Sequence, residues 1–179
     1  MAGLVAKNYC EAIFSIALED KTLDLYKEQL QFVDETMAEA DFYTILSHPK
    51  ISRAEKKDVL EKVYAKDLDA TLLNFLKLLI DKGHFRSLHD IVKEYIKSYN
   101  EVNNIQVVYV RSASVLKEDE IQRLIKALEN KLHKKIDLRL CVDEDLIAGI
   151  RVKINDEIID NSAVSRLERM RKSVSLTKI

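Results

Sequence analysis

The sequence predicts an α+β protein in which an N-terminal six-helix bundle precedes a small α/β domain with the element order β-α-β-β-β-α. The 179 residues include only three Gly and one Pro, which favours long helices with short connections. Apolar residues recur at helical spacing as far as residue 102, whereas a strand-like apolar run begins at Ile105. We therefore expect two domains, residues 1–104 and 105–179, with the boundary close to Asn103 and Asn104.

The first domain contains several local signals for helices. In the first helix, Tyr9 and Ile13 share one apolar stripe. Ser52 followed three residues later by Glu55 predicts a capping box, and Gly83 suits the left-handed residue that ends a helix. The six helices are expected at residues 4–18, 21–40, 42–46, from 53 onward, 71–81 and 84–102.

The fifth helix is apolar on all sides. A helix of this kind is usually surrounded by others. Either it forms the centre of the bundle, or one of its sides is a docking surface. Its apolar residues are Leu72, Leu73, Phe75, Leu76, Leu78, Leu79 and Ile80.

The second domain is expected to contain strands at residues 105–110 and 136–142, with a helix between them at residues 117–133. A hairpin follows, in which Val152 and its apolar neighbours alternate with Arg151 and Lys153. This period of two places the apolar residues on one face and the cations on the other. The turn is expected at Asn155 and Asp156, which tolerate positive φ, and residues 160–162 can cap a final helix.

The residue pattern contains no catalytic constellation. Three scattered glycines cannot form a phosphate-binding loop, and His84 and His89 are five residues apart on a helix, where they point away from each other. Cys10 and Cys141 form no metal motif, and both are expected to be buried free thiols. We therefore expect no enzyme activity, no cofactor and no metal. No apolar run is long enough to span a bilayer.

The charge is distributed unevenly. Residues 1–104 carry 14 Lys and Arg against 18 Asp and Glu, a charge of −4, whereas residues 105–179 carry 15 against 12, a charge of +3. The basic second half makes a nucleic-acid-binding adaptor the alternative function; the cations could also form a solvated face, or one that meets an acidic helix. Against it, no strand carries paired aromatics for base stacking, and no Gly-x-x-Gly loop precedes a helix. The cations that raise the question are Arg139, Arg151, Lys153, Arg166, Arg169, Arg171 and Lys172.

The C-terminal segment resembles the signature of one known family. It reads Leu146-Ile147-Ala148-Gly149-Ile150-Arg151-Val152, then Ile158-Ile159-Asp160-Asn161-Ser162, then Arg166-Leu167-Glu168-Arg169-Met170-Arg171. This resembles the delta subunit of F-type ATP synthases, whose mitochondrial relative is the oligomycin-sensitivity-conferring protein. The family usually has Gly-Gly where this chain has Ala148 and Gly149, and often Gly where Asn155 and Asn161 stand.

Three N-terminal segments resemble the same family. The first helix, residues 5–14, is similar to the family's Tyr-Ala-x-Ala-Leu-Phe opening, with Cys10 and Ile13 as substitutions. Residues 46–57 resemble its Leu-x-x-Pro-x-Ile link, and residues 79–85 resemble a Leu-Leu-x-x-x-Gly-Arg segment, with His84 in place of Arg. The four segments span nearly the whole chain in the expected order.

The resemblance implies a non-catalytic stator subunit of the proton-translocating F-type ATP synthase. It would link the N-termini of the alpha subunits in the catalytic head to the b subunits of the peripheral stalk, so that rotor torque drives ATP synthesis. One copy per complex is implied, monomeric when alone, without nucleic acid or direct membrane insertion, at the cytoplasmic face of the bacterial plasma membrane. The implied alpha-subunit site comprises Tyr9, Ile13, Asn74, Phe75 and Leu78, and the implied b-subunit site comprises Ile150, Val152, Arg166, Leu167, Arg169 and Met170.

Overall fold

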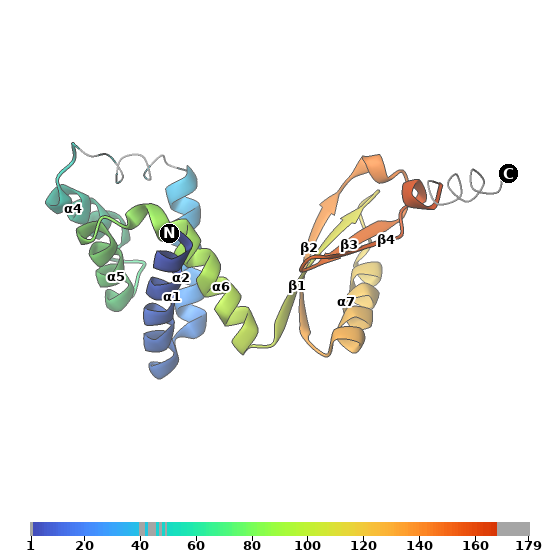
Figure 1. The fold of residues 1–179 in the computed structure, drawn as a ribbon, viewed down its shortest axis with the longest axis horizontal. Helices are drawn as coiled ribbons and strands as arrows, with labels where there is room; N and C mark the ends of the chain where they lie inside the picture. Colours follow the sequence, from blue (N-terminus) through green and yellow to red (C-terminus); the bar gives the residue numbers. More distant parts are fainter. Residues whose placement is uncertain (1, 40–41, 43–45, 47, 49, 168–179) are drawn as a thin grey trace. The chain divides into compact units, whose positions relative to one another are not determined.

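The chain is α+β and divides into two compact units, residues 1–99 and 100–179 (Figure 1). The computed structural model describes residues 2–39, 42, 46, 48 and 50–167. The helices before the sheet are α1 (Ala2–Glu19), α2 (Leu23–Glu39), α4 (Arg53–Tyr64), α5 (Ala70–Asp81), the 3₁₀ turn η1 (Phe85–Ser87) and α6 (Leu88–Val102). The short helix expected at residues 42–46 lies largely outside the described residues.

The local signals for helix ends are confirmed. The Glu55 backbone N–H donates to Ser52 Oγ at 3.2 Å, and the Ser52 N–H donates to a Glu55 carboxylate oxygen at 2.9 Å, which completes the capping box at the start of α4. Gly83 has φ +72° directly after α5. The left-handed conformation is available to glycine without a steric penalty, so the chain can turn from α5 into η1.

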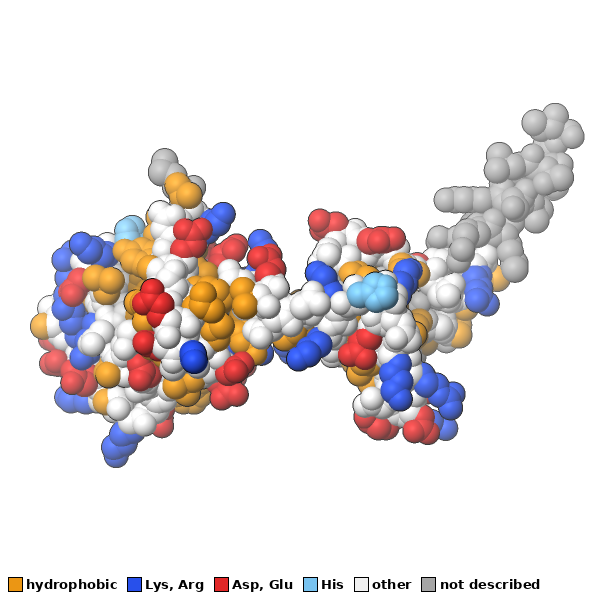
Figure 2. All heavy atoms as spheres, turned by 90° about the horizontal axis from the view of Figure 1, so that it is seen from below, with side chains coloured by type: hydrophobic (Ala, Val, Ile, Leu, Met, Phe, Trp, Pro, Cys, Tyr) orange, Lys and Arg blue, Asp and Glu red, His pale blue; other side chains and the backbone are white. Residues whose placement is uncertain are grey.

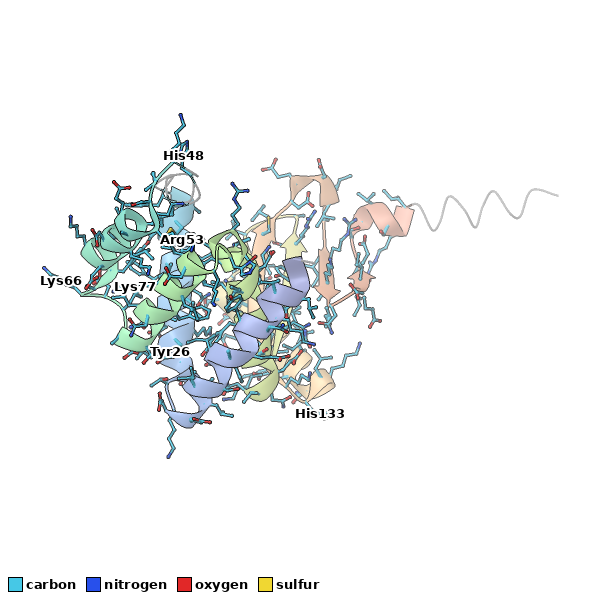
Figure 3. All side chains as sticks on the ribbon, turned by 60° about the vertical axis from the view of Figure 1, so that its left-hand side comes forward. Tyr26, His48, Arg53, Lys66, Lys77 and His133 are labelled. Carbon is cyan, nitrogen blue, oxygen red and sulfur yellow. The ribbon has the colours of Figure 1, made fainter. Side chains whose placement is uncertain are left out.

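The helical unit encloses its own hydrophobic core. Leu72, Leu76 and Leu79 of α5 are completely buried, so α5 is largely a core helix. A polar contact also connects α2 to the start of α5: the Tyr26 hydroxyl donates to the Asp69 carboxylate at 3.1 Å. On the surface, Lys77 pairs with Glu61 of α4 at 2.9 Å, and Figure 3 labels both Tyr26 and Lys77. Figure 2 shows cations and anions interspersed over this unit, with apolar patches between them.

The second unit is a mixed four-stranded sheet with the order β2-β1-β3-β4. The central strand β1 runs parallel to β2 and antiparallel to β3, and β3 and β4 form an antiparallel hairpin whose turn contains Asn155 at φ 51°. A separate small core, which includes Val108, Val110 and Leu128, joins the sheet to α7. The elements are β1 (Ile105–Ser112), α7 (Glu118–Leu132), β2 (Lys135–Val142), the 3₁₀ turn η2 (Glu144–Leu146), β3 (Ile150–Ile154) and β4 (Glu157–Asp160), and residues 163–167 are helical.

Candidate functional site

An aromatic cluster joins α1 to α5 and to the turn that follows it. The Tyr9 and Phe75 rings form a T-shaped pair, with 6.2 Å between ring centroids and an interplanar angle of 71°. The same ring lies 5.8 Å from the His84 imidazole. Phe75 is buried, Tyr9 is half-buried and His84 is exposed, so the cluster runs from the core to the surface. Such a graded aromatic cluster can present an apolar anchor point to a partner.

The structure separates the five residues predicted for the alpha-subunit site. Asn74 is exposed and Leu78 is 43% exposed, and at a spacing of four they share one face of α5. Tyr9 is half-buried, and its ring packs against Phe75. Ile13, in contrast, is 1% exposed within the helical core, so it anchors α1 to that core and cannot contact a partner in this conformation. The sequence-based site omitted His84, which the Gly83 turn brings to Tyr9.

The C-terminal signature builds a junction inside the second unit. Gly149 has φ +91°, and a Cβ at this position would lie 2.6 Å from the carbonyl oxygen of Asn161. Ala163 donates its N–H to the Ala148 carbonyl at 2.8 Å across the same approach. Only glycine allows two backbone segments to come this close at such a φ value. The glycine of the signature therefore has a structural role.

Asp160 completes this junction. Its carboxylate accepts the Ser162 backbone N–H at 2.9 Å and the Arg151 guanidinium at 2.8 Å. Hydrogen bonds from Ser162 stabilise the charged form, so the pKa of the Asp160 carboxyl lies well below its usual range. Ser162 is itself fully buried, and its Oγ accepts the Ser165 N–H at 3.3 Å. Asp160 and Ser162 thus attach the start of the last helix to the hairpin.

The residues predicted for the b-subunit site also fall into separate groups. Val152 is 6% exposed and packs under α7, together with the half-buried Ile150, so both belong mainly to the sheet core. A buried side chain cannot contact a partner unless this core opens. Arg166 is exposed and Leu167 is 61% exposed at the start of the last helix. The two remaining residues, Arg169 and Met170, lie outside the described residues.

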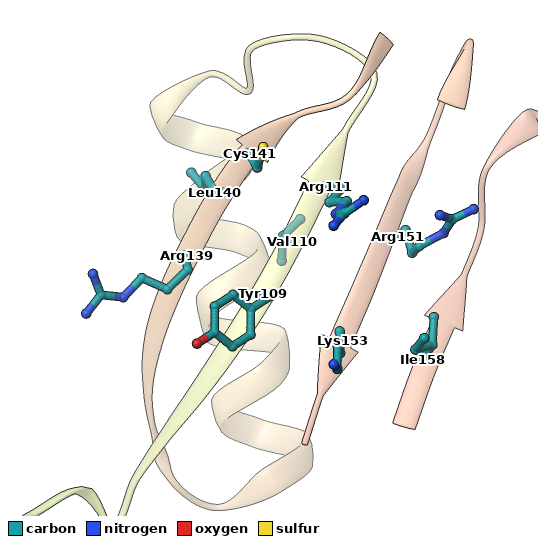
Figure 4. Close-up of a pocket in the computed structure, with 9 residues that line it drawn as sticks. All are labelled: Tyr109, Val110, Arg111, Arg139, Leu140, Cys141, Arg151, Lys153 and Ile158. Atoms are coloured by element: carbon teal, nitrogen blue, oxygen red, sulfur yellow. The ribbon is translucent and has the colours of Figure 1, made fainter. Parts of the chain in front are cut away.

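A shallow pocket lies on the sheet face opposite α7 (Figure 4). Arg139 of β2, Arg111 of β1 and Lys153 of β3 reach it from neighbouring strands. The pattern of alternation had identified Arg139, Arg151 and Lys153 as strand cations but not their convergence, which depends on the strand order. Tyr109 and Ile158 were also missed. The residues that line the pocket are Tyr109, Val110, Arg111, Arg139, Leu140, Cys141, Arg151, Lys153 and Ile158.

The cysteine prediction is half right. Cys10 is buried and free, and burial raises the pKa of its thiol. Cys141 is free but exposed, so the prediction of a buried thiol is wrong there. It lies on the open face of β2, at the edge of the sheet, where α7 does not cover it. Among the described residues, no three His, Cys, Asp or Glu side chains are grouped so that they could hold a metal, and no helix is long and apolar enough to cross a membrane.

Comparison with known proteins gives the family. The sequence model described as "ATP synthase delta (OSCP) subunit" matches residues 5–174. The chain belongs to this family. Proteins named ATP synthase subunit delta are 34% identical in Clostridioides difficile, over 98% of both chains, and 34% identical in Clostridium perfringens, over 93% of both. One from Desulfitobacterium hafniense is 32% identical over 98% of both.

A solved structure has the same fold. It is a chain of the cryo-EM structure of the Toxoplasma gondii mitochondrial ATP synthase hexamer, with a TM-score of 0.69 and 17% identity, covering 97% of this chain and 98% of that one. Members of the family are structural stator subunits, and the chain is accordingly a non-catalytic coupling subunit. None of the comparisons supports the nucleic-acid-binding alternative.

Proposed function

We propose that the chain joins the catalytic head of a rotary ATP synthase to its peripheral stalk and thereby keeps the head from turning with the rotor. The helical unit would receive the N-termini of the alpha subunits, and the second unit would receive the ends of the b subunits. The match to the delta family over residues 5–174 carries this proposal. The family fold also implies a sixth helix in the bundle near residues 42–46, and a final helix that closes the β-α-β-β-β-α order.

The aromatic cluster supports the alpha-subunit contact. The Tyr9 ring is partly accessible and is held by Phe75, so a partner would not have to order a mobile side chain. Leu78 adds an exposed apolar contact, and Asn74 adds an exposed amide on the same helix face. An apolar centre with a polar rim is typical of protein interfaces. Ile13 would act only by holding α1 in place.

The last helix supports a contact with the stalk. Leu167 offers an exposed apolar side chain, and Arg166 offers an exposed cation beside it. The proposed b-subunit contact also includes Arg169 and Met170. The b subunits would meet this helix rather than Val152, which the domain's own core already covers.

The proposed setting is the cytoplasmic face of the bacterial plasma membrane, where the chain would be peripheral and present once per complex. The three relatives compared above are bacterial proteins. Alone, the chain is expected to be monomeric, and it would bind no nucleotide or other cofactor.

Two measurements test the proposal. A tagged chain should retain alpha and b subunits from solubilised membranes, and a peptide from the alpha-subunit N-terminus should bind in calorimetric titration. Recovery of neither subunit, or no heat with the peptide, would contradict the proposed partners. DNA and RNA should show no salt-dependent binding at micromolar protein, because a nucleic-acid binder releases counterions when it contacts phosphates.

A further inference from the structure

The sheet of the second unit has one face that no described element covers. On its other face, α7 packs against Val108, Val110 and Val152. On the open face, Tyr109 is 56% exposed and Ile158 is 59% exposed, although both occupy regular strands. The four strands, spaced by about 4.8 Å, make this face about 14 Å wide, which accommodates one helix of about 10 Å diameter.

The strand register arranges the side chains of the open face in two rows. One row crosses all four strands as Arg139, Tyr109, Lys153 and Ile158. The next row, two residues further along each strand, reads Cys141, Arg111, Arg151 and Asp160. Tyr109 therefore has a cation on each side, and four cations stand within two adjacent rows (Figure 4).

The open face places two arginines in a position that is unfavourable for the sheet by itself. Arg111 and Arg151 are direct cross-strand partners, and like charges in this position are destabilising. Each has an acid beside it: Asp143 for Arg111 at 3.5 Å, and Asp160 for Arg151 at 2.8 Å. In the neighbouring row, Arg139 pairs with Asp137 of its own strand at 3.0 Å. Lys153 has no ion pair with any described residue.

We infer that the open sheet face binds an amphipathic helix with an acidic side, whose apolar residues cover Tyr109 and Ile158. Carboxylates of such a helix would neutralise Lys153 and relieve the repulsion between Arg111 and Arg151. A helix also fits the width of the face, as α7 does on the other side. This inference rests on the proposed function, because the helix is expected to come from the stalk; it adds a contact surface separate from Arg166 and Leu167.

Other occupants fit the charges less well. The chain's own residues 168–179 contain Arg169, Arg171, Lys172 and Lys178 against Glu168, so they carry the same sign as the face. RNA would meet cations, but recognition of single strands uses several aromatic side chains as stacking platforms. Among the residues that line the pocket, Tyr109 is the sole aromatic.

The test measures binding of the full chain to the purified soluble part of the stalk b subunits. The variant reverses the two charges beside Tyr109, Arg139→Glu with Lys153→Glu. Its matched control reverses an exposed Arg and Lys on α7, Arg123→Glu with Lys126→Glu. We expect at least tenfold weaker binding for the variant, less than twofold change for the control, and affinity that falls as salt rises. Tyr109→Ser provides a second variant without a charge change, and it too should weaken binding about tenfold. Circular dichroism checks that each variant is folded.

Three results would overturn the inference. If folded variants of both kinds bind the stalk as tightly as the control, the stalk contact lies elsewhere and the proposed function stands alone. If the unmutated chain does not bind the stalk, both fail. The third result is that the chain binds a 12-nucleotide RNA, or dimerises in sedimentation. If the charge reversal abolishes either interaction while stalk binding persists, the face binds RNA or a second copy of the chain.

Discussion

Substituting alanine for Gly149 should destabilise the second unit strongly. An alanine at φ +91° pays a penalty of about 1–2 kcal/mol for the left-handed backbone. Its Cβ would also lie 2.6 Å from the Asn161 carbonyl oxygen and 3.1 Å from the Ser162 Cα. These are backbone atoms that cannot rotate away, so relief requires moving the segment, at about 1–3 kcal/mol by analogy with overpacked cores. The expected total is about 3 kcal/mol.

The chain contains matched controls for this change. Gly83 has φ +72°, but a Cβ added there would have no neighbouring atom within 4 Å, so Gly83→Ala should cost only the backbone penalty of about 1–2 kcal/mol. Gly3 lies in α1 with open space and no positive φ, so Gly3→Ala should be neutral or stabilising by up to about 1 kcal/mol.

Urea unfolding followed by circular dichroism measures the series. With a slope of about 1 kcal/mol per molar urea for a small unit, Gly149→Ala should lower the midpoint of its transition by about 3 M. The order of destabilisation should be Gly149, then Gly83, then Gly3. A Gly149→Ala shift no larger than that of Gly83→Ala would show that the close approach to Asn161 relaxes freely and would refute the reasoning.

Three further predictions concern the aromatic cluster, the acidic junction and the domain boundary. Tyr9→Ala should lower the free energy of unfolding of the isolated chain by about 1–2 kcal/mol, less than the 3–5 kcal/mol typical of a fully buried aromatic. It should weaken binding of an alpha-subunit N-terminal peptide by about 2 kcal/mol. The control Phe14→Ala, on the side of α1 that faces Tyr95, should lower stability and leave peptide affinity unchanged. The folded-state pKa of Asp160 is depressed, so its contribution to stability is present above its unfolded pKa and is lost as the pH falls below about 5. Asp160→Asn should therefore make the free energy of unfolding fall less steeply with decreasing pH in this range. An unchanged pH dependence would contradict this role. Limited proteolysis should cut near residues 100–104 and release a folded helical fragment; loss of all helical signal on cutting would count against independent domains.

Local features of the chain could be predicted because their causes are local. The capping box needs only Ser52 and Glu55 at the right spacing, and the turn residue Asn155 needs only tolerance of positive φ. The buried side of the hairpin followed in the same way from alternation, which already placed Val152 inside. For Val152 this pattern favours the core over the partner contact that the family resemblance implies.

Features that depend on pairing between distant segments could not be predicted. Alternation shows that β2 has two faces, but the position of α7 and the order β2-β1-β3-β4 decide which face is open. For Cys141 the alternation was informative, because it places this residue on the side of Asp137 and Arg139; the expectation of a buried thiol followed the apolar character of the strand and was wrong. The two rows of side chains around Tyr109, in contrast, exist only once the register is known. The contact between His84 and Tyr9 depends on the turn at Gly83, and hydrophobic periodicity does not indicate the direction that the chain takes after a turn.

The central position of β1 has a mechanical consequence. This strand begins at Ile105, and only two residues separate it from the end of α6 at Val102. It is hydrogen-bonded on both sides, to β2 along eight residues and to β3 along five. Tension that enters through α6 and acts along the strand axis loads both rows of hydrogen bonds in shear. Bonds loaded in shear share the force and yield together, whereas an edge strand such as β4 can be peeled off one bond at a time. The chain thus passes from its helical unit into the strand of the sheet that is best placed to resist a pull.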